Sequence, residues 1–186
     1  MVKVYVFLAD GFEEIEALGP VDILRRAGAK VTMVSIMPSK EVTAAHGVTV
    51  VADAMFADTD LNDADLLFLP GGGSGAQRLN EHEGVRKAVL CQYDCGRYVA
   101  AICAAPKVFG SIGILKGKRA TIYPGLEECL TGAQHVVATH VIDGNIVTGY
   151  GPAAVLPFAY TLVELLFGKG KREEIENDMV YPQLFK

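Results

Sequence analysis

The sequence contains no cluster of basic residues and no apolar run long enough to cross a membrane. Seventeen Lys and Arg against 22 Asp and Glu give a formal net charge of -5, and a negative surface repels nucleic-acid phosphates. The first apolar run ends at Asp10, short of the ~20 residues that a membrane helix needs and too short for an export signal. We therefore expect a cytoplasmic protein that binds neither nucleic acid nor membranes.

Cysteine and histidine are scarce, with four residues of each. Without an export signal, we expect free thiols in a reducing compartment rather than two disulfides. Cys91 and Cys95 lie four residues apart, but no second Cys or His cluster occurs at zinc spacing, and an amphipathic helix face explains the pair equally well. We expect no metal site. The four cysteines are Cys91, Cys95, Cys103 and Cys129.

Apolar strands and amphipathic helices alternate along the chain, and the length of 186 residues fits one domain, residues 1–186. Four buried runs separated by helices predict an α/β three-layer sandwich with a mainly parallel sheet. Asp143 and Gly144 predict a hairpin turn, and 46–56 alternates like an exposed or antiparallel pair. The expected strands are 2–8, 30–36, 63–70 and 97–102, and the expected helices are 19–29, 85–96, 105–115 and 154–168.

Three polar or small-residue segments follow predicted strands. In an open parallel sheet, ligands bind where the carboxyl ends of the strands lead into helices. The segments at that edge are "ADGFEEIEA" (9–17), "PGGGSGAQ" (70–77) and "ICAAP" (102–106). We therefore expect residues from these segments to form one site.

Cys103 lies between a predicted strand and a predicted helix, with no histidine, serine or charged residue beside it. The small neighbours Ala101 and Ala105 suit the tight, strained turn of a nucleophile elbow. A helix N-terminus after the cysteine lowers the pKa of a thiol, so we expect Cys103 to titrate well below a free thiol. The sequence geometry fits a buried structural cysteine equally well.

The glycine-rich segment has two interpretations. Gly71, Gly73 and Ala76 match the dinucleotide-binding pattern, but no acidic residue ends the next strand about 20 residues on. We favour the alternative that Gly71 and Gly72 bring backbone N–H groups close to the thiol. A plain tight turn stays open, and we expect no cofactor.

Three glutamates follow the first strand. Glu13 and Glu14 fit solvated acids at a helix start. Glu16 lies between Ile15 and Ala17, and a carboxyl group among apolar groups near a thiol would have a raised pKa and share one proton with it. Spacing alone favours another solvated acid at Glu16.

The segments "LADGFEEIEALGPVDILRRAG", "LPGGGSGAQ" and "AAICAAP", followed by "GPAAVLPFA", resemble the ThiJ/PfpI superfamily in its branch of DJ-one-like deglycases. The resemblance runs nearly end to end. It implies a flavodoxin-like sandwich of the class I glutamine amidotransferase-like type and a homodimer. It also implies a nucleophilic Cys103, a protonated Glu16 partner and backbone N–H groups of Gly72 and Ala104 around the sulfur.

The sequence departs from the family pattern at several places. Ala104 replaces the histidine that follows the cysteine in the protease-like branch, so we do not expect peptidase activity. The histidine of the deglycase branch falls on Tyr123, as an auxiliary site residue, and an arginine before the later Gly-Pro is replaced by Tyr150. An arginine contributed by the partner subunit falls on His46. Compared with the family pattern, the expected site has fewer positively charged side chains that could bind an anion.

The resemblance also implies a two-fold interface through the first helix. Asp22, Arg25 and Arg26 would pair across it, and a charge at Val21 or Leu24 would split the dimer. His46 would then approach the Cys103 of the partner subunit.

Two classes of function follow from the resemblance. The first is a cofactor-free glyoxalase or protein deglycase acting on small α-oxoaldehydes such as methylglyoxal, or on glycated adducts, in carbonyl and oxidative stress. Cys103 would attack the aldehyde, and Glu16 would move the proton. The second is a redox-sensing protein or chaperone whose cysteine is oxidised to sulfinate without metabolic turnover.

Overall fold

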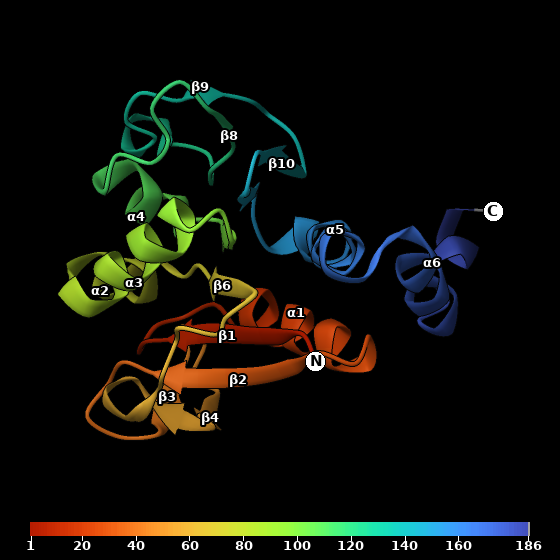
Figure 1. The fold of residues 1–186 in the computed structure, drawn as a ribbon, viewed down its shortest axis with the longest axis horizontal. Coiled ribbons are helices and arrows are strands. Elements are labelled where there is room, and N and C mark those ends of the chain that lie inside the picture. The colour runs from red at the N-terminus through yellow and green to blue at the C-terminus, as the bar shows by residue number, and fades with distance from the viewer. Residues whose placement is uncertain (186) are drawn as a thin grey trace.

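The computed structural model describes residues 1–185, and Lys186, the last residue of the expected domain, lies outside the described residues. A seven-stranded sheet runs through the molecule (Figure 1). In spatial order its strands are β10 (His140–Asp143), β11 (Ile146–Gly149), β7 (Tyr98–Ile102), β6 (Leu66–Leu69), β1 (Lys3–Leu8), β2 (Lys30–Ser35) and β5 (Ala54–Met55). The expected α/β class is confirmed.

All neighbouring strands of this sheet are parallel except the pair of β10 and β11. That pair is the hairpin expected at Asp143 and Gly144, and Gly144 takes the positive φ of 64° that the tight turn requires. Every residue of β6 is buried, as expected for a strand that is covered on both faces.

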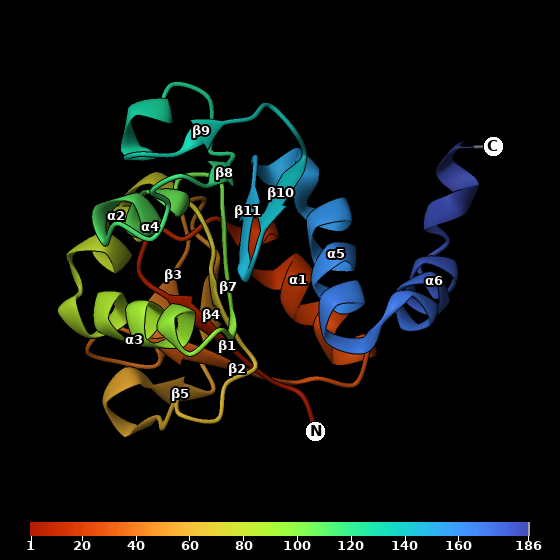
Figure 2. The ribbon, with the colours of Figure 1, turned by 45° about the horizontal axis from the view of Figure 1, so that its top comes forward.

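Helices cover both faces of the sheet (Figure 2). Helices α1 (Glu14–Arg26) and α5 (Val155–Phe167) pack together on one face, and α6 (Lys169–Asp178) packs against α5. Helices α2 (Gly73–Glu81), α3 (Glu83–Asp94) and α4 (Pro106–Ser111) lie on the other face. This arrangement is the three-layer sandwich. No helix among residues 1–185 is both long and apolar enough to span a bilayer.

Helix α1 begins at Glu14, five residues before the expected start. The Glu13 side chain accepts a hydrogen bond from the Glu16 N–H at 2.7 Å and so caps the helix. Val21 and Leu24 point into the core of their own protomer. The expectation that these two residues face a dimer interface is therefore wrong, since a charge there would disrupt the protomer itself.

Two small sheets lie outside the main one. Within the segment 46–56, β4 (Thr49–Val51) forms an antiparallel pair, but its partner is β3 (Glu41–Thr43), which precedes the segment, and β5 pairs parallel with β2. The short parallel pair of β8 (Arg119–Ala120) and β9 (Gln134–His135) was not expected. All four cysteines are free thiols, as expected.

Candidate active site

The strand order brings the three polar segments together. Strand β6 lies between β1 and β7, and all three are parallel. Their carboxyl ends therefore meet at one edge of the sheet, and the segments 9–17, 70–77 and 102–106 follow directly from them. The expected site position follows from this adjacency.

Cys103 has a positive φ of 61°. Among residues 1–185 only Val180 shares this feature outside glycine, and a side chain in this region costs about 1–2 kcal/mol. Hydrogen bonds fix the turn on both sides, because the Cys103 N–H donates to the Gly149 carbonyl and the Tyr123 N–H donates to the Cys103 carbonyl, each at 2.9 Å. The backbone thus holds the cysteine in the geometry of a nucleophile elbow.

The Glu16 carboxyl group is fully buried beside the Cys103 thiol and the Gly71 N–H, and neither of its oxygens makes a hydrogen bond of regular geometry. Burial raises the pKa of Glu16 to about 7; the neighbouring Cys103 thiol opposes this rise and the charge of Glu13 adds to it. The raised pKa expected near a thiol is confirmed. The interpretation of Glu16 as a solvated helix acid is wrong, because the carboxyl-edge loops cover this side chain.

Cys103 is 8% exposed. Burial raises the pKa of its thiol to about 12, and the charge of Glu16 adds to the rise, whereas the N–H groups of Gly72 and Ala104 lower it. The expected drop of this pKa below that of a free thiol is therefore wrong. Helix α4 has only six residues, so its dipole is too small to offset the desolvation of a thiolate.

Gly71 and Gly72 lie where side chains cannot fit. A Cβ atom at Gly71 would collide with Glu16 Oε2 and would lie 2.6 Å from Cys103 Cβ. Gly72 has a φ of 89°, and a Cβ atom there would lie 2.6 Å from the Glu13 N. Glycine therefore lets this loop approach both the carboxyl group and the thiol.

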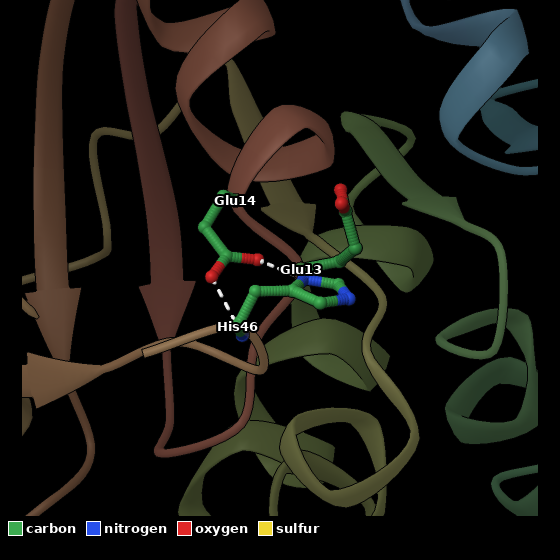
Figure 3. A group of neighbouring side chains, drawn as sticks. All are labelled: Glu13, Glu14 and His46. Atoms are coloured by element: carbon green, nitrogen blue, oxygen red, sulfur yellow. Dashed lines mark hydrogen bonds and ion pairs between the residues drawn. The ribbon is translucent and has the colours of Figure 1, made fainter. Parts of the chain in front are cut away.

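Glu13 and Glu14 are not solvated acids. Glu13 is 9% exposed and caps α1, and Glu14 is bound by His46 (Figure 3). The Glu14 carboxylate accepts a hydrogen bond from the His46 N–H at 2.7 Å, and its other oxygen lies 2.8 Å from His46 Nδ1. This carboxylate raises the pKa of His46. This contact could not be predicted from local patterns, because the two residues lie 32 positions apart.

His46 is 73% exposed on the loop between β3 and β4. One ligand atom each from Glu13, Glu14 and His46 lie within 4.8 Å of one another, but His46 Nδ1 is bound to Glu14 and the Glu13 carboxylate accepts from the Glu16 N–H. The absence of a metal and the approach of His46 to a partner subunit both stay predictions.

Tyr123 and Tyr150 lie on either side of the Cys103 backbone. The Tyr123 N–H binds the Cys103 carbonyl, and Tyr150 follows Gly149, which accepts from the Cys103 N–H. Both tyrosines line one cavity. No charged residue takes the place of the two basic residues expected from the family pattern.

The mainly parallel sheet between two helical layers is that of a flavodoxin-like α/β protein of the class I glutamine amidotransferase-like type. At its carboxyl edge, the strained Cys103 beside the buried Glu16 forms a nucleophile elbow. Residues 2–165 match the DJ-1/PfpI family, and the chain belongs to this family.

Curated relatives and a solved structure extend this likeness. Protein DJ-1 homolog B of Arabidopsis thaliana is 42% identical over 96% of this chain. A deglycase of Pyrococcus abyssi is 32% identical, over 89% of this chain and 99% of its own length. The oxidized DJ-1 of Toxoplasma gondii has a TM-score of 0.93 at 32% identity, with 97% of this chain and 98% of that chain covered.

The relatives differ in length. The chain spans 41% of Arabidopsis homolog B and 45% of homolog A. The comparisons therefore show the family and the fold of this chain, whereas its activity is proposed.

Proposed function

We propose that this protein is a cofactor-free glyoxalase or deglycase-like enzyme that acts on α-oxoaldehydes such as methylglyoxal, or on early glycation adducts. The observation that carries the proposal is the pairing of a strained Cys103 with Glu16, whose pKa is raised to about 7. A general base with such a pKa is well matched to neutral pH.

The first step joins the thiol to the aldehyde. The Cys103 sulfur bonds to the aldehyde carbon, and the thiol proton passes to the Glu16 carboxylate and from there to the aldehyde oxygen, which gives a hemithioacetal and restores the carboxylate. Because burial raises the pKa of Cys103 to about 12, the resting group is a thiol that loses its proton as it attacks. The N–H groups of Gly72 and Ala104 are the proposed donors to the developing charge.

The second step moves a proton between the two carbons. The Glu16 carboxylate removes the proton from the former aldehyde carbon and returns it to the neighbouring carbon, while the hydroxyl proton moves to the oxygen of that neighbouring carbon, which gives a 2-hydroxy thioester. Water then cleaves the C–S bond, releases the hydroxy acid and restores the thiol. One carbon is oxidised while its neighbour is reduced, so no external oxidant or cofactor takes part.

The name of the Pyrococcus relative, a deglycase that aligns over nearly its whole length, supports this proposal. Ala104 follows Cys103 in place of a histidine, so we propose no peptidase activity. The free thiols fit a reducing cytoplasm.

Product analysis with methylglyoxal tests the function. We expect the wild type to form lactate in buffer free of amines and thiols, and Cys103→Ser and Glu16→Gln each to lose at least ~100-fold in kcat/KM. Cys91→Ser is the matched control, because this thiol is exposed and lies on α3, outside the site. If methylglyoxal disappears without lactate being formed, it only forms an adduct with the protein, and the proposed enzymatic activity is refuted.

A second candidate function is redox sensing. Glu16 has two buried oxygens without partners next to Cys103, so its protonated form can donate a hydrogen bond to a cysteine sulfinate. This candidate predicts that mild peroxide converts Cys103 to sulfinate before it modifies Cys91 or Cys95, as followed by peptide mass spectrometry. Earlier modification of the two exposed cysteines would contradict it.

We also propose that the protein is a homodimer in which His46 approaches the site of the partner subunit. Three exposed apolar side chains support an interface beside His46: Ile15 (58% exposed), Val48 (48%) and Val51 (64%). We call these three residues the apolar patch. The pairing of His46 with Glu14 places the loop that precedes Val48 next to Ile15.

A further inference from the structure

A cavity of about 460 Å³ opens beside the candidate active site. This size is in the range of small-molecule sites in proteins. The cavity lies between the loop after β8, the segment before β10 and the turn between β11 and α5. Its lining residues are Tyr123, Pro124, Val137, Ala138, Thr139, Tyr150, Gly151, Pro152, Ala153 and Ala154.

Backbone hydrogen bonds attach two walls of this cavity to Cys103. One wall begins at Tyr123, whose N–H donates to the Cys103 carbonyl, and the other follows Gly149, whose carbonyl accepts from the Cys103 N–H. The two walls also approach each other, since a Cβ atom at Gly151 would lie 3.4 Å from the Tyr123 ring. The backbone of Cys103 therefore connects two walls of this cavity.

The lining is apolar and carries no charge. It has no Lys, Arg, His, Asp or Glu among its ten residues, and its side-chain polar groups are the hydroxyls of Tyr123, Tyr150 and Thr139. The Thr139 hydroxyl is 3.2 Å from His140 Nδ1, so it has a protein partner. A bound charge would find no counter-ion here and would lose its hydration, whereas aromatic and branched aliphatic groups would bury apolar surface.

We infer that this cavity is a subsite for a large, uncharged substituent on the carbonyl carbon of the α-oxoaldehyde. This inference rests on the proposed function and names its substrate class: aromatic and branched aliphatic glyoxals are preferred to methylglyoxal, whose single methyl group leaves most of the cavity empty. Tyr123 and Tyr150 supply the aromatic walls and set this preference.

Filling the cavity tests the inference. Ala153 is exposed at the cavity wall, so Ala153→Trp adds bulk there without displacing a core side chain. We expect it to lower the ratio of kcat/KM for phenylglyoxal to kcat/KM for methylglyoxal by about tenfold or more. Comparing ratios between variants cancels the different intrinsic reactivities of the two aldehydes.

Ala57→Trp is the matched control. Ala57 is equally exposed but follows β5, at the opposite edge of the sheet from β10, and this variant should keep the wild-type ratio. In the wild type, 4-carboxyphenylglyoxal should react at least about tenfold less efficiently than phenylglyoxal, because its charge would enter the uncharged cavity. Equal efficiency of these two substrates would overturn the inference.

A binding measurement separates the subsite from the catalytic proposal. Acetophenone, a neutral aryl ketone without the aldehyde, should slow the alkylation of Cys103 by iodoacetamide in the wild type and in Ala57→Trp, but not in Ala153→Trp. If methylglyoxal is turned over and the substrate ratio is the same in all three proteins, the subsite is wrong and the proposed function stands. If no glyoxal is turned over while acetophenone protects, the function fails and the subsite stands.

Discussion

The strained backbone at Cys103 indicates that this cysteine has a function beyond filling the core. A cysteine that only filled the core could adopt a relaxed conformation, whereas a φ of 61° has a cost for any residue with a Cβ atom. The hydrogen bonds to Gly149 and Tyr123 maintain the strained turn. Strain of this kind is characteristic of functional sites.

This strain can be measured with two inactive variants. Cys103→Ala keeps the Cβ atom and Cys103→Gly removes it, so we expect the glycine variant to have a free energy of unfolding higher than the alanine variant by about 1 kcal/mol. At Ala101, inside β7, the change to glycine should instead destabilise by a similar amount. Urea denaturation of these three variants and the wild type measures both differences, and a Cys103→Gly variant less stable than Cys103→Ala would refute the strain.

The buried Glu16 makes stability depend on pH. Its pKa is about 7 in the folded protein and near 4.5 in the unfolded chain, so the folded state binds the proton more tightly and loses stability as pH rises from about 4.5 to 7. The shift corresponds to about 3 kcal/mol. The free energy of unfolding of Glu16→Gln minus that of the wild type should therefore be about 3 kcal/mol larger at pH 8 than at pH 4.

Urea denaturation at both pH values measures this effect. The exposed Glu128→Gln removes the same charge away from the site and should show no such difference between the two pH values. An equal difference in both variants would mean that general surface charge, and not burial of Glu16, causes the effect.

At the residue scale, the sequence predicted which residues meet but not how deeply they are buried. The positions of Cys103, Gly72 and Glu16 follow from strand ends, which local patterns reveal. The burial of Glu16 depends on the 70–77 and 102–106 loops closing over it, and acid residues in a first helical turn are usually solvated. The raised pKa of the thiol follows from the same burial, so it was missed for the same reason.

At the scale of elements, the glycine-rich loop controls the approach of two functional groups. Gly71→Ala places a methyl group against Glu16 Oε2 and Cys103 Cβ. We expect it to destabilise the protein by about 1–3 kcal/mol and to abolish most of the methylglyoxal turnover. Denaturation and the lactate assay measure the two effects.

Gly73→Ala is the matched control two residues away. Nothing lies within 4 Å of a Cβ atom at Gly73, the first residue of α2, and alanine favours a helix over glycine. This variant should keep its activity and be as stable as the wild type or more stable by up to about 1 kcal/mol. Equal losses in both variants would show that the loop needs general flexibility and not the close approach at Gly71.

The helix boundaries show where local patterns fail. Helix α1 starts at Glu14 because Glu13 caps it, and glutamate is not among the favoured N-cap residues, so the apolar spacing predicted a start only at residue 19. Helix α2 was missed because glycine has low helix propensity. Its Gly75 is required by packing, as a Cβ atom there would lie 2.6 Å from the Phe12 N.

At the scale of the whole molecule, the sheet and its two helical layers were predictable because buried parallel strands are continuous apolar runs. The seven-strand order was not, since it depends on pairings between distant residues such as Leu66 with Tyr98. The dimer interface could not be predicted for the same reason, because it also depends on contacts between distant residues. Helical spacing marked Val21 and Leu24 as apolar but could not tell that they face the core of the protomer.

The apolar patch predicts where two protomers meet. Val51 is 64% exposed, so Val51→Glu leaves the protomer core intact, but in a dimer it buries a charge without a partner on both subunits. Such a charge costs about 3 kcal/mol or more, so the dissociation constant should rise by about a hundredfold or more for each of the two copies. Sedimentation should then find a dimer for the wild type and a monomer for Val51→Glu at micromolar concentration.

Val180→Glu is the control, because Val180 is 59% exposed and lies after α6, outside the patch. If the patch is the interface, this variant stays a dimer. If His46 completes the site of the partner subunit, Val51→Glu also loses methylglyoxal turnover, and raising the protein concentration restores dimer and activity together. A monomeric wild type would refute both the interface and the shared role of His46, whereas a dimeric Val51→Glu would place the interface on another face.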